Sequence, residues 1–262
     1  MSEKFDPEKF YESYPLKVIA RPGYTTRAQY KSTLLWDRYG DIVLKILGRC
    51  RNYADIGGCF GFGANAMRYQ IFCTQGSYPA TKVFEISPEF ISIGKHLFPY
   101  IEFIKTDFRL YNGAPDVFDL ITLFDIIEHV QNPEEFLISV AKRTKLALIK
   151  TPMETGGDWF GAKPPLNQGE SHGDGHINFY SPKEYLALLD RSGLELLAGK
   201  FVKSIVPSGT GRRILIPECS LSKKSLLTAG LSDIYQMIPY FITRRLVGRG
   251  DHIGLVGSRR NL

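Results

Sequence analysis

The sequence predicts a three-layer α/β sandwich, in which a mostly parallel sheet lies between two layers of helices. Short strand-like stretches alternate with helical stretches of about ten to fifteen residues between residues 49 and 205. Some strand-like stretches, such as 117–124, are apolar almost throughout, as expected of strands buried on both faces. Several helix starts carry a cap residue followed by proline and an acid, as in Ser87-Pro88-Glu89.

Length and composition fit one large domain. The chain has 262 residues, 44% hydrophobic and 23% charged, which excludes disordered and fibrous proteins. Charges interrupt every long apolar stretch, as Asp233 does within 225–243, and the N-terminus lacks the apolar core of a secretory signal. The four cysteines contain no C-x-x-C pair, so we expect reduced thiols. These features predict a cytoplasmic protein without a membrane span.

Positive charge is concentrated in the last quarter of the chain. The net charge is +6, and eleven Lys and Arg face three acidic residues from Gly199 onward. Such a segment suits an anionic substrate, a membrane surface or nucleic acid, although a solvated basic face explains it equally well.

Two segments outside the α/β alternation show their own patterns. Residues 1–25 lack periodicity and are predicted to form an arm, whereas apolar residues recur at helical intervals across 26–48. We expect this N-terminal arm and helical cap, 1–48, to precede a domain of residues 49–262. A helical pattern within 207–250 predicts an insertion that packs as an extra helix, or forms a lid or an oligomer surface, before the last strand.

The remaining elements follow in order. We expect strands at 53–56, 82–86, 101–105, 117–124 and 146–151, and helices at 64–72, after Ser87, from Asn132 to near Lys145, and from Ser181 to Gly193. Right-handed crossovers then place the loops after the parallel strands along one edge, where open α/β sheets bind their ligands.

A glycine-rich turn follows the first strand, with the sequence Asp55-Ile56-Gly57-Gly58-Cys59-Phe60-Gly61-Phe62-Gly63. Glycines let the chain bend sharply and let a ligand approach the backbone closely. The last three residues together with Ala66 also fit a dinucleotide fingerprint, which leaves a nicotinamide-dependent dehydrogenase as a rival. The Tyr-x-x-x-Lys pair of its short-chain type occurs only at Tyr78 and Lys82, ahead of the second strand.

Acidic residues come at the ends of three successive strands: Asp55, Glu85 and Asp107. A carboxylate such as Glu85 can accept hydrogen bonds from both hydroxyls of a ribose. Asp107 followed by Phe108 suits an adenine, because the carboxylate accepts from the exocyclic amine and the ring offers a stacking face. Three acids at three strand ends predict a nucleoside site at this edge of the sheet.

These motifs resemble those of the class I S-adenosylmethionine-dependent methyltransferases. The likeness rests on Asp55-x-Gly57-x-x-x-Gly61, Glu85, Asp107, and three longer stretches: 118–130 followed by Asn132-Pro133, 146–152, and 175–181. The three longer stretches resemble the branch that includes ubiquinone-biosynthesis O-methyltransferases. The resemblance implies a Rossmann-like sheet of seven strands with an antiparallel last strand at 252–258. It also implies S-adenosylmethionine as cofactor, S-adenosylhomocysteine as product, and a cofactor site formed by Asp55, Gly57, Gly58, Gly61, Glu85, Ile86, Asp107, Phe108 and Phe124.

Cys59 is a departure from that family pattern, because it replaces the middle glycine of the loop. Its side chain would narrow the methionine end of the pocket. A domain that binds the cofactor without catalysis therefore stays an alternative.

Methyl transfer from a sulfonium requires alignment and, for a hydroxyl acceptor, a base that removes the proton. The candidates are Asp125, Glu128 and His129 after the fourth strand, and His172, Asp174 and His176 in a later loop. His129 and His176 are the predicted catalytic residues.

Two other interpretations of these residues remain open. Asp125, Glu128, His129 and His176 resemble the metal ligands of plant small-RNA 2′-O-methyltransferases, which would imply Mg²⁺ or Mn²⁺. The alternative is that Glu128 and His129 stabilise a local turn. The expected acceptor is a small molecule or a sugar. RNA ranks second, because the basic residues are dispersed and few aromatic residues are interleaved with them. The sequence leaves the oligomeric state open.

Overall fold

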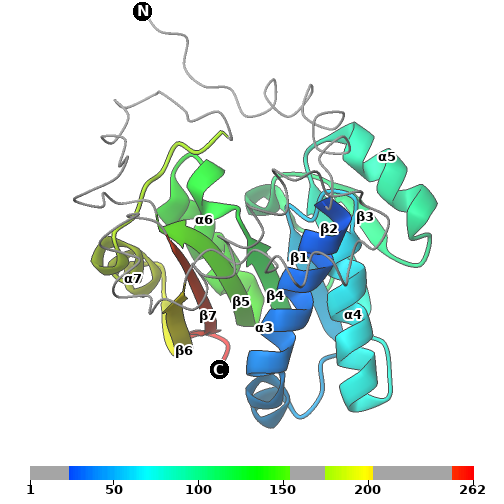
Figure 1. The fold of residues 1–262 in the computed structure, drawn as a ribbon, viewed down its shortest axis with the longest axis horizontal. Coiled ribbons are helices and arrows are strands. Elements are labelled where there is room, and N and C mark those ends of the chain that lie inside the picture. Colours follow the sequence, from blue (N-terminus) through cyan, green and yellow to red (C-terminus); the bar gives the residue numbers. More distant parts are fainter. Residues whose placement is uncertain (1–23, 154–174, 203–249) are drawn as a thin grey trace, which may run out of the picture.

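The computed structural model describes residues 24–153, 175–202 and 250–262. Within them, seven strands form one mixed sheet with helices on both faces (Figure 1). The predicted insertion 207–250, apart from Gly250, and the candidate residues His172 and Asp174 lie outside the described residues. None of the helices found in these three ranges is both long and apolar enough to cross a membrane.

The strand order is β3-β2-β1-β4-β5-β7-β6. The strands are β1 (Asn52–Ile56), β2 (Ala80–Glu85), β3 (Glu102–Lys105), β4 (Phe118–Phe124), β5 (Thr144–Met153), β6 (Leu194–Val202) and β7 (Gly250–Ser258). The first five pair in parallel, and β7 is antiparallel to both β5 and β6. The predicted mostly parallel sheet with an antiparallel last strand is confirmed.

Helices cover the sheet in two groups (Figure 1). The first group is α3 (Tyr24–Leu47), α4 (Phe62–Gln75) and α5 (Pro88–Leu97), and the second is α6 (Pro133–Arg143) and α7 (Pro182–Arg191). Each group packs against its own cluster of buried apolar side chains, one on each face of the sheet. Burial on both faces explains why β4 and the centre of β5 are apolar in the sequence.

Two serines begin helices as their sequence context predicts. The Ser87 side chain accepts from the backbone N–H of Phe90 at the start of α5. Ser181 and Glu184 form a complete capping box at the start of α7. The cap at Ser87 fixes the turn from β2 to α5 at the ligand edge, and the capping box fixes the start of α7.

Helix α3 contributes to the apolar core on one face of the sheet. Leu35, Trp36 and Val43 are buried in the same cluster as residues of α4 and β1. The Tyr39 hydroxyl donates to the carbonyl of Ile253 in β7 at 3.1 Å. The division into 1–48 and 49–262 stays a prediction, but α3 packs against α4 and shares the apolar core on this face of the sheet.

Candidate active site

The glycine turn connects β1 to α4 at the carboxyl edge of the sheet. Gly57 and Gly61 have φ angles of 67° and 84°, which favour glycine. A Cβ on Gly57 would lie 2.1 Å from the Cδ1 atom of Ile126, and one on Gly61 would lie 2.7 Å from the Phe103 ring. The turn therefore packs directly against the residues that follow β4, and two of its three predicted motif positions require glycine.

Cys59 adopts the left-handed conformation as well, with φ 48°. Non-glycine residues rarely do so, and such strain is concentrated at functional sites. Its backbone N–H donates to Glu85 at 3.0 Å, which compensates in part for the strained conformation. The thiol packs near the rings of Tyr24 and Phe60, which meet edge-to-face at 5.9 Å.

Glu85 lies at the end of β2 beneath this turn and is 6% exposed. One carboxylate oxygen accepts from the backbone N–H groups of Ile86 and Ser87 at 2.7 and 3.0 Å, and the other accepts from Cys59. Burial raises its pKa, and the three N–H donors oppose that rise. Since a carboxylate has about four acceptor sites, Glu85 has room for one ribose hydroxyl without giving up a backbone partner.

Asp55 is buried at the end of β1 and supports the turn from below. Its Oδ1 atom accepts from the Thr122 hydroxyl on the neighbouring β4 at 2.6 Å. A Cβ on Gly58 would lie 2.7 Å from Oδ2, so the carboxyl touches the turn. Burial raises the pKa of Asp55 to about 7, against the effect of the Thr122 hydrogen bond.

Asp107 and Phe108 are placed differently from the prediction. Asp107 accepts four hydrogen bonds from Arg109, and these outweigh burial and lower its pKa. Phe108 is 2% exposed, and its ring packs edge-on against Phe84 at 4.9 Å. The expectation that this ring stacks on an adenine is therefore wrong for this structure, because protein covers the ring. Asp107 keeps access to solvent with a third of its side chain exposed.

Ile86 and Phe124, the last two cofactor candidates, both lie partly buried at the ligand edge. Ile86 follows β2, and its N–H is already bonded to Glu85. Phe124 ends β4 and packs against the cluster beneath α3 and α4. They lie at the ends of β2 and β4, the two strands that flank β1, where they suit opposite walls of one pocket.

Asp125 follows β4 with φ 58° and is enclosed by two lysines. One carboxylate oxygen pairs with Lys31 of α3 and the other with Lys150 of β5, which also pairs with Asp251 at 3.1 Å. Burial alone would raise the pKa of Asp125, but the two ammonium groups lower it well below its usual range. Asp125 is thus a permanent carboxylate whose oxygens are used within the protein, unlike the proton acceptor or metal ligand that the sequence suggested.

Glu128, His129 and His176 lie together beside it. One ligand atom from each lies within 4.8 Å of the others, and the two imidazole rings meet edge-to-face at 4.8 Å. Backbone hydrogen bonds hold the two segments, since the N–H groups of Ile177 and Asn178 both donate to the Glu128 carbonyl. The structure therefore brings both predicted catalytic histidines into one cluster.

Glu128 is an unusual member of that cluster. It is 1% exposed, and neither carboxyl oxygen has a hydrogen-bond partner among the described residues. Burial, followed by the charge of Asp125, raises its pKa well above the usual range. A buried carboxyl in this state stays protonated unless a cation approaches it, and His129 Nε2 is 4.0 Å from its Oε1 atom.

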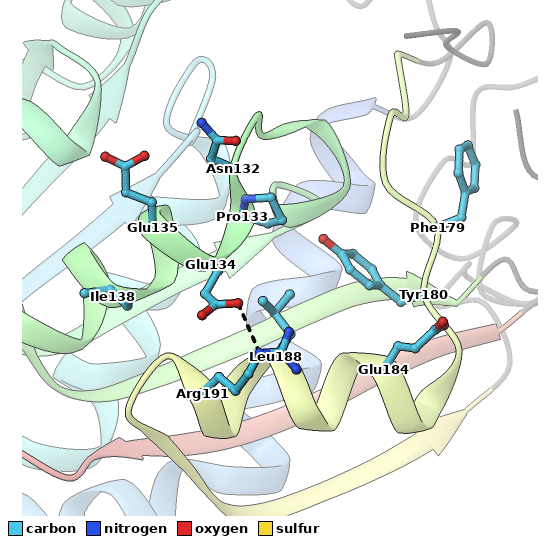
Figure 2. Close-up of a pocket in the computed structure, with 10 residues that line it drawn as sticks. All are labelled: Asn132, Pro133, Glu134, Glu135, Ile138, Phe179, Tyr180, Glu184, Leu188 and Arg191. Carbon is cyan, nitrogen blue, oxygen red and sulfur yellow. Dashed lines mark hydrogen bonds and ion pairs between the residues drawn. The ribbon is translucent and has the colours of Figure 1, made fainter. Parts of the chain in front are cut away.

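A groove of about 700 Å³ lies between the N-terminal half of α6 and helix α7 (Figure 2). Its acids are engaged with protein groups, since Glu134 pairs with Arg191 at 3.1 Å and Glu184 accepts from Ser181. The hydroxyl of Tyr180 points toward the middle of the groove and has no hydrogen-bond partner among the described residues (Figure 2). None of the cluster Glu128, His129 and His176 lines the groove.

Four residues of this region were not predicted from the sequence: Tyr24, Lys31, Thr122 and Lys150. Two of them had a visible signal. Lys31 lies one and two helical turns before Leu35 and Tyr39 on the apolar side of α3, and Lys150 interrupts an apolar strand. A lysine in either place predicts a buried acidic partner. Tyr24 and Thr122 had no such signal.

This sheet order, with a glycine turn after β1 and acids at the ends of β1 and β2, defines a class I methyltransferase that uses S-adenosylmethionine. The family model for a methyltransferase domain matches residues 36–198, and the chain belongs to that family. None of the curated proteins compared with the chain matches it.

Solved structures share the fold at low identity. A protein described as a sarcosine dimethylglycine methyltransferase from Galdieria sulphuraria is 16% identical with a TM-score of 0.54, covering 87% of this chain and 85% of its own. An S-adenosylmethionine-dependent methyltransferase from Clostridium acetobutylicum ATCC 824 is 13% identical with a TM-score of 0.53, covering 95% and 98%. The [4+2]-cyclase SpnF is 13% identical with a TM-score of 0.52, covering 85% and 81%. At these identities the likeness shows the fold and not the acceptor.

Proposed function

We propose that this methyltransferase transfers its methyl group to a hydroxyl oxygen of a small molecule or a sugar. The observation that supports the proposal is the pair His129 and His176 beside Glu128, directly after β4. The turn at Gly57 touches Ile126, two residues before this cluster. A donor methyl held at the glycine turn would therefore face the histidines.

The cofactor site of this proposal follows the carboxyl ends of the first four strands. Glu85 accepts from a ribose hydroxyl, Asp55 supports the turn, and Asp107 faces the adenine from the loop after β3. The remaining members contribute backbone or apolar walls: Gly57, Gly58, Gly61, Ile86 and Phe124. The backbone at Phe108, rather than its ring, lies beside Asp107.

The histidine pair supplies the base. The Nδ1 atom of His129 lies 2.9 Å from the Gly175 carbonyl, which can only accept, so Nδ1 carries the proton and Nε2 keeps its lone pair. As the methyl moves from sulfur to the acceptor oxygen, the hydroxyl proton moves to a histidine nitrogen and neutral S-adenosylhomocysteine is released. Glu128, 4.0 Å away, would stabilise the imidazolium at His129.

Two finer assignments belong to the same proposal. The segments around Glu128-His129 and Gly175-His176 support membership of the branch that includes ubiquinone-biosynthesis O-methyltransferases. Cys50, Cys59 and Cys73 are free thiols, which supports a cytoplasmic location.

The acceptor class is tested with S-adenosylmethionine carrying a tritiated methyl group. Incubation with small-metabolite, glycan and RNA fractions of a cell extract is expected to label the first or the second, and NMR of the purified product should show a methoxy group. Label confined to RNA and released by ribonuclease, or a methyl group on nitrogen or carbon, would contradict the proposal.

A metal-assisted O-methylation is the second candidate. The carboxyl of Glu128 and the two imidazoles lie close enough to hold a divalent cation. Among the described residues the Glu128 oxygens have no hydrogen-bond partner that a cation would have to displace. The Gly175 carbonyl orients His129 through Nδ1, as backbone carbonyls often orient metal-binding histidines. Bound there, a cation would stabilise the acceptor oxygen as an alkoxide. Asp125 does not complete this set, because two lysines hold its oxygens.

The two candidates differ in their response to chelation. A metal-assisted enzyme loses turnover in excess EDTA and recovers with Mg²⁺ or Mn²⁺, and Mn²⁺ binding seen by EPR is lost in Glu128→Gln. Asp119→Asn, in a lysine-paired acid at the opposite end of β4, serves as the control for Mn²⁺ binding. Full activity in excess chelator would remove the metal and leave the histidine base.

A further inference from the structure

A chain of alternating charges crosses the ligand edge of the sheet beneath α3. It runs from Lys31 through Asp125 and Lys150 to Asp251. Lys150 contacts two carboxylates, and its side chain is 8% exposed. Lys31, at the open end of the chain, is 23% exposed and contacts one carboxylate among the described residues. Its ammonium group therefore retains donors that point to no described acceptor.

Lys31 spans the gap between the glycine turn and the end of β4. The next residue, Ser32, donates through its hydroxyl to the Gly63 carbonyl at 2.9 Å, which ties this part of α3 to the start of α4. The charge of Lys31 reaches the Cys59 thiol on one side, where it opposes the rise in the thiol pKa that burial causes, and it pairs with Asp125 on the other side. Any ligand lying between the turn and Asp125 meets this ammonium group.

We propose that Lys31 binds the α-carboxylate of the methionyl part of S-adenosylmethionine. The inference rests on the cofactor site proposed above, in which the adenosine lies toward Glu85 and the sulfonium faces the histidines. The amino-acid end of the cofactor then lies near the turn and α3. A carboxylate beside Lys31 continues the alternation of charge, whereas the cofactor's ammonium group in the same place would be repelled by the Lys31 ammonium.

Asp125 positions Lys31 in this arrangement. Because Lys150 supplies a second ammonium group, Asp125 remains ionised and holds Lys31 in place when the cofactor is absent. An anionic group of the acceptor is the other possible source of a carboxylate or phosphate at Lys31. The two sources are separated by measuring cofactor binding without any acceptor.

The test compares two ligands that differ only at the amino-acid end. S-adenosylhomocysteine carries the carboxylate, and 5′-deoxy-5′-methylthioadenosine keeps the adenosine and the sulfur without it. In calorimetric titrations, Lys31→Met is expected to weaken the first about 10- to 100-fold, as for the loss of a hydrogen bond to a charged group, and to leave the second unchanged. Lys31→Arg should retain most of the affinity, and Lys45→Met, in an exposed lysine of the same helix, should change neither.

Each other outcome overturns the proposal in a recognisable way. Equal losses for both ligands would mean that Lys31 stabilises the site without touching the carboxylate. Unchanged S-adenosylhomocysteine affinity would remove the cofactor carboxylate as its partner. Failure of the unmodified protein to bind either ligand would overturn the proposed cofactor site itself.

Discussion

Replacement of Glu85 by alanine is expected to weaken S-adenosylhomocysteine binding by about 100-fold or more. The carboxylate accepts from the N–H of strained Cys59 and, in the proposed site, from a ribose hydroxyl. The ribose hydrogen bond to this charged acceptor contributes about 1.5–3 kcal/mol, which is about 10- to 100-fold in affinity. Loss of the Cys59 bond releases the glycine turn and weakens cofactor binding further. Calorimetric titration measures the loss.

Two further variants distinguish a direct loss of cofactor affinity from a loss caused by unfolding. Glu85→Gln keeps one carbonyl oxygen for the backbone donors and should fall between the wild type and the alanine variant. Glu89→Gln, in an exposed acid on the first turn of α5, should bind normally. Wild-type affinity in a folded Glu85→Ala protein would show that the ribose lies elsewhere.

Replacement of His176 by alanine is expected to lower kcat by about 10²- to 10⁴-fold, the usual contribution of a positioned acid or base. The affinity for S-adenosylhomocysteine should change less than about twofold, because His176 lies on the acceptor side of the proposed site. His129→Ala should lower kcat similarly, because the two rings are in contact.

His96→Ala is the matched control, since His96 is exposed on α5 and away from the cluster. The measurement is the rate of S-adenosylhomocysteine release with an identified acceptor. A kcat unchanged in His176→Ala, or cofactor affinity that falls together with kcat, would assign the histidines a structural role in place of a catalytic one.

The fold follows from local features that the sequence displays directly. The apolar run of β4, the caps at Ser87 and Ser181 and the glycines at positive φ each act within a few residues. The ends of several elements differ, and the residues of one strand, β6 (Leu194–Val202), were not predicted. The strand predicted at 146–151 extends to Thr144–Met153, because β7 pairs with it from Leu146 to Met153 and β4 pairs with Thr144.

The site is less predictable because the sequence pattern around a side chain does not show which partner it binds. Asp107 resembles an adenine-binding acid in sequence, and that pattern did not indicate that Arg109, two residues later, donates to both of its oxygens. Asp125 resembles a base or a metal ligand, yet Lys31 pairs with it across 94 residues. Sequence reasoning found the acids at the strand ends but did not identify which cations they bind.

The effect of Cys59 on the glycine turn was also not predictable from the sequence. The sequence suggests that a cysteine in the glycine turn narrows the methionine end of the pocket, and an inactive cofactor-binding module was one consequence. The structure has Cys59 in a left-handed conformation that favours glycine, and its backbone N–H donates to Glu85. The turn thus keeps its shape at the cost of backbone strain.

The orientation of the cofactor is the central claim, and a crystal structure of the complex with S-adenosylhomocysteine tests it most directly. We predict the ribose on Glu85, the carboxylate on Lys31 and the sulfur facing His129 and His176. A cofactor bound at the same turn with its sulfur directed away from the two histidines would contradict the account.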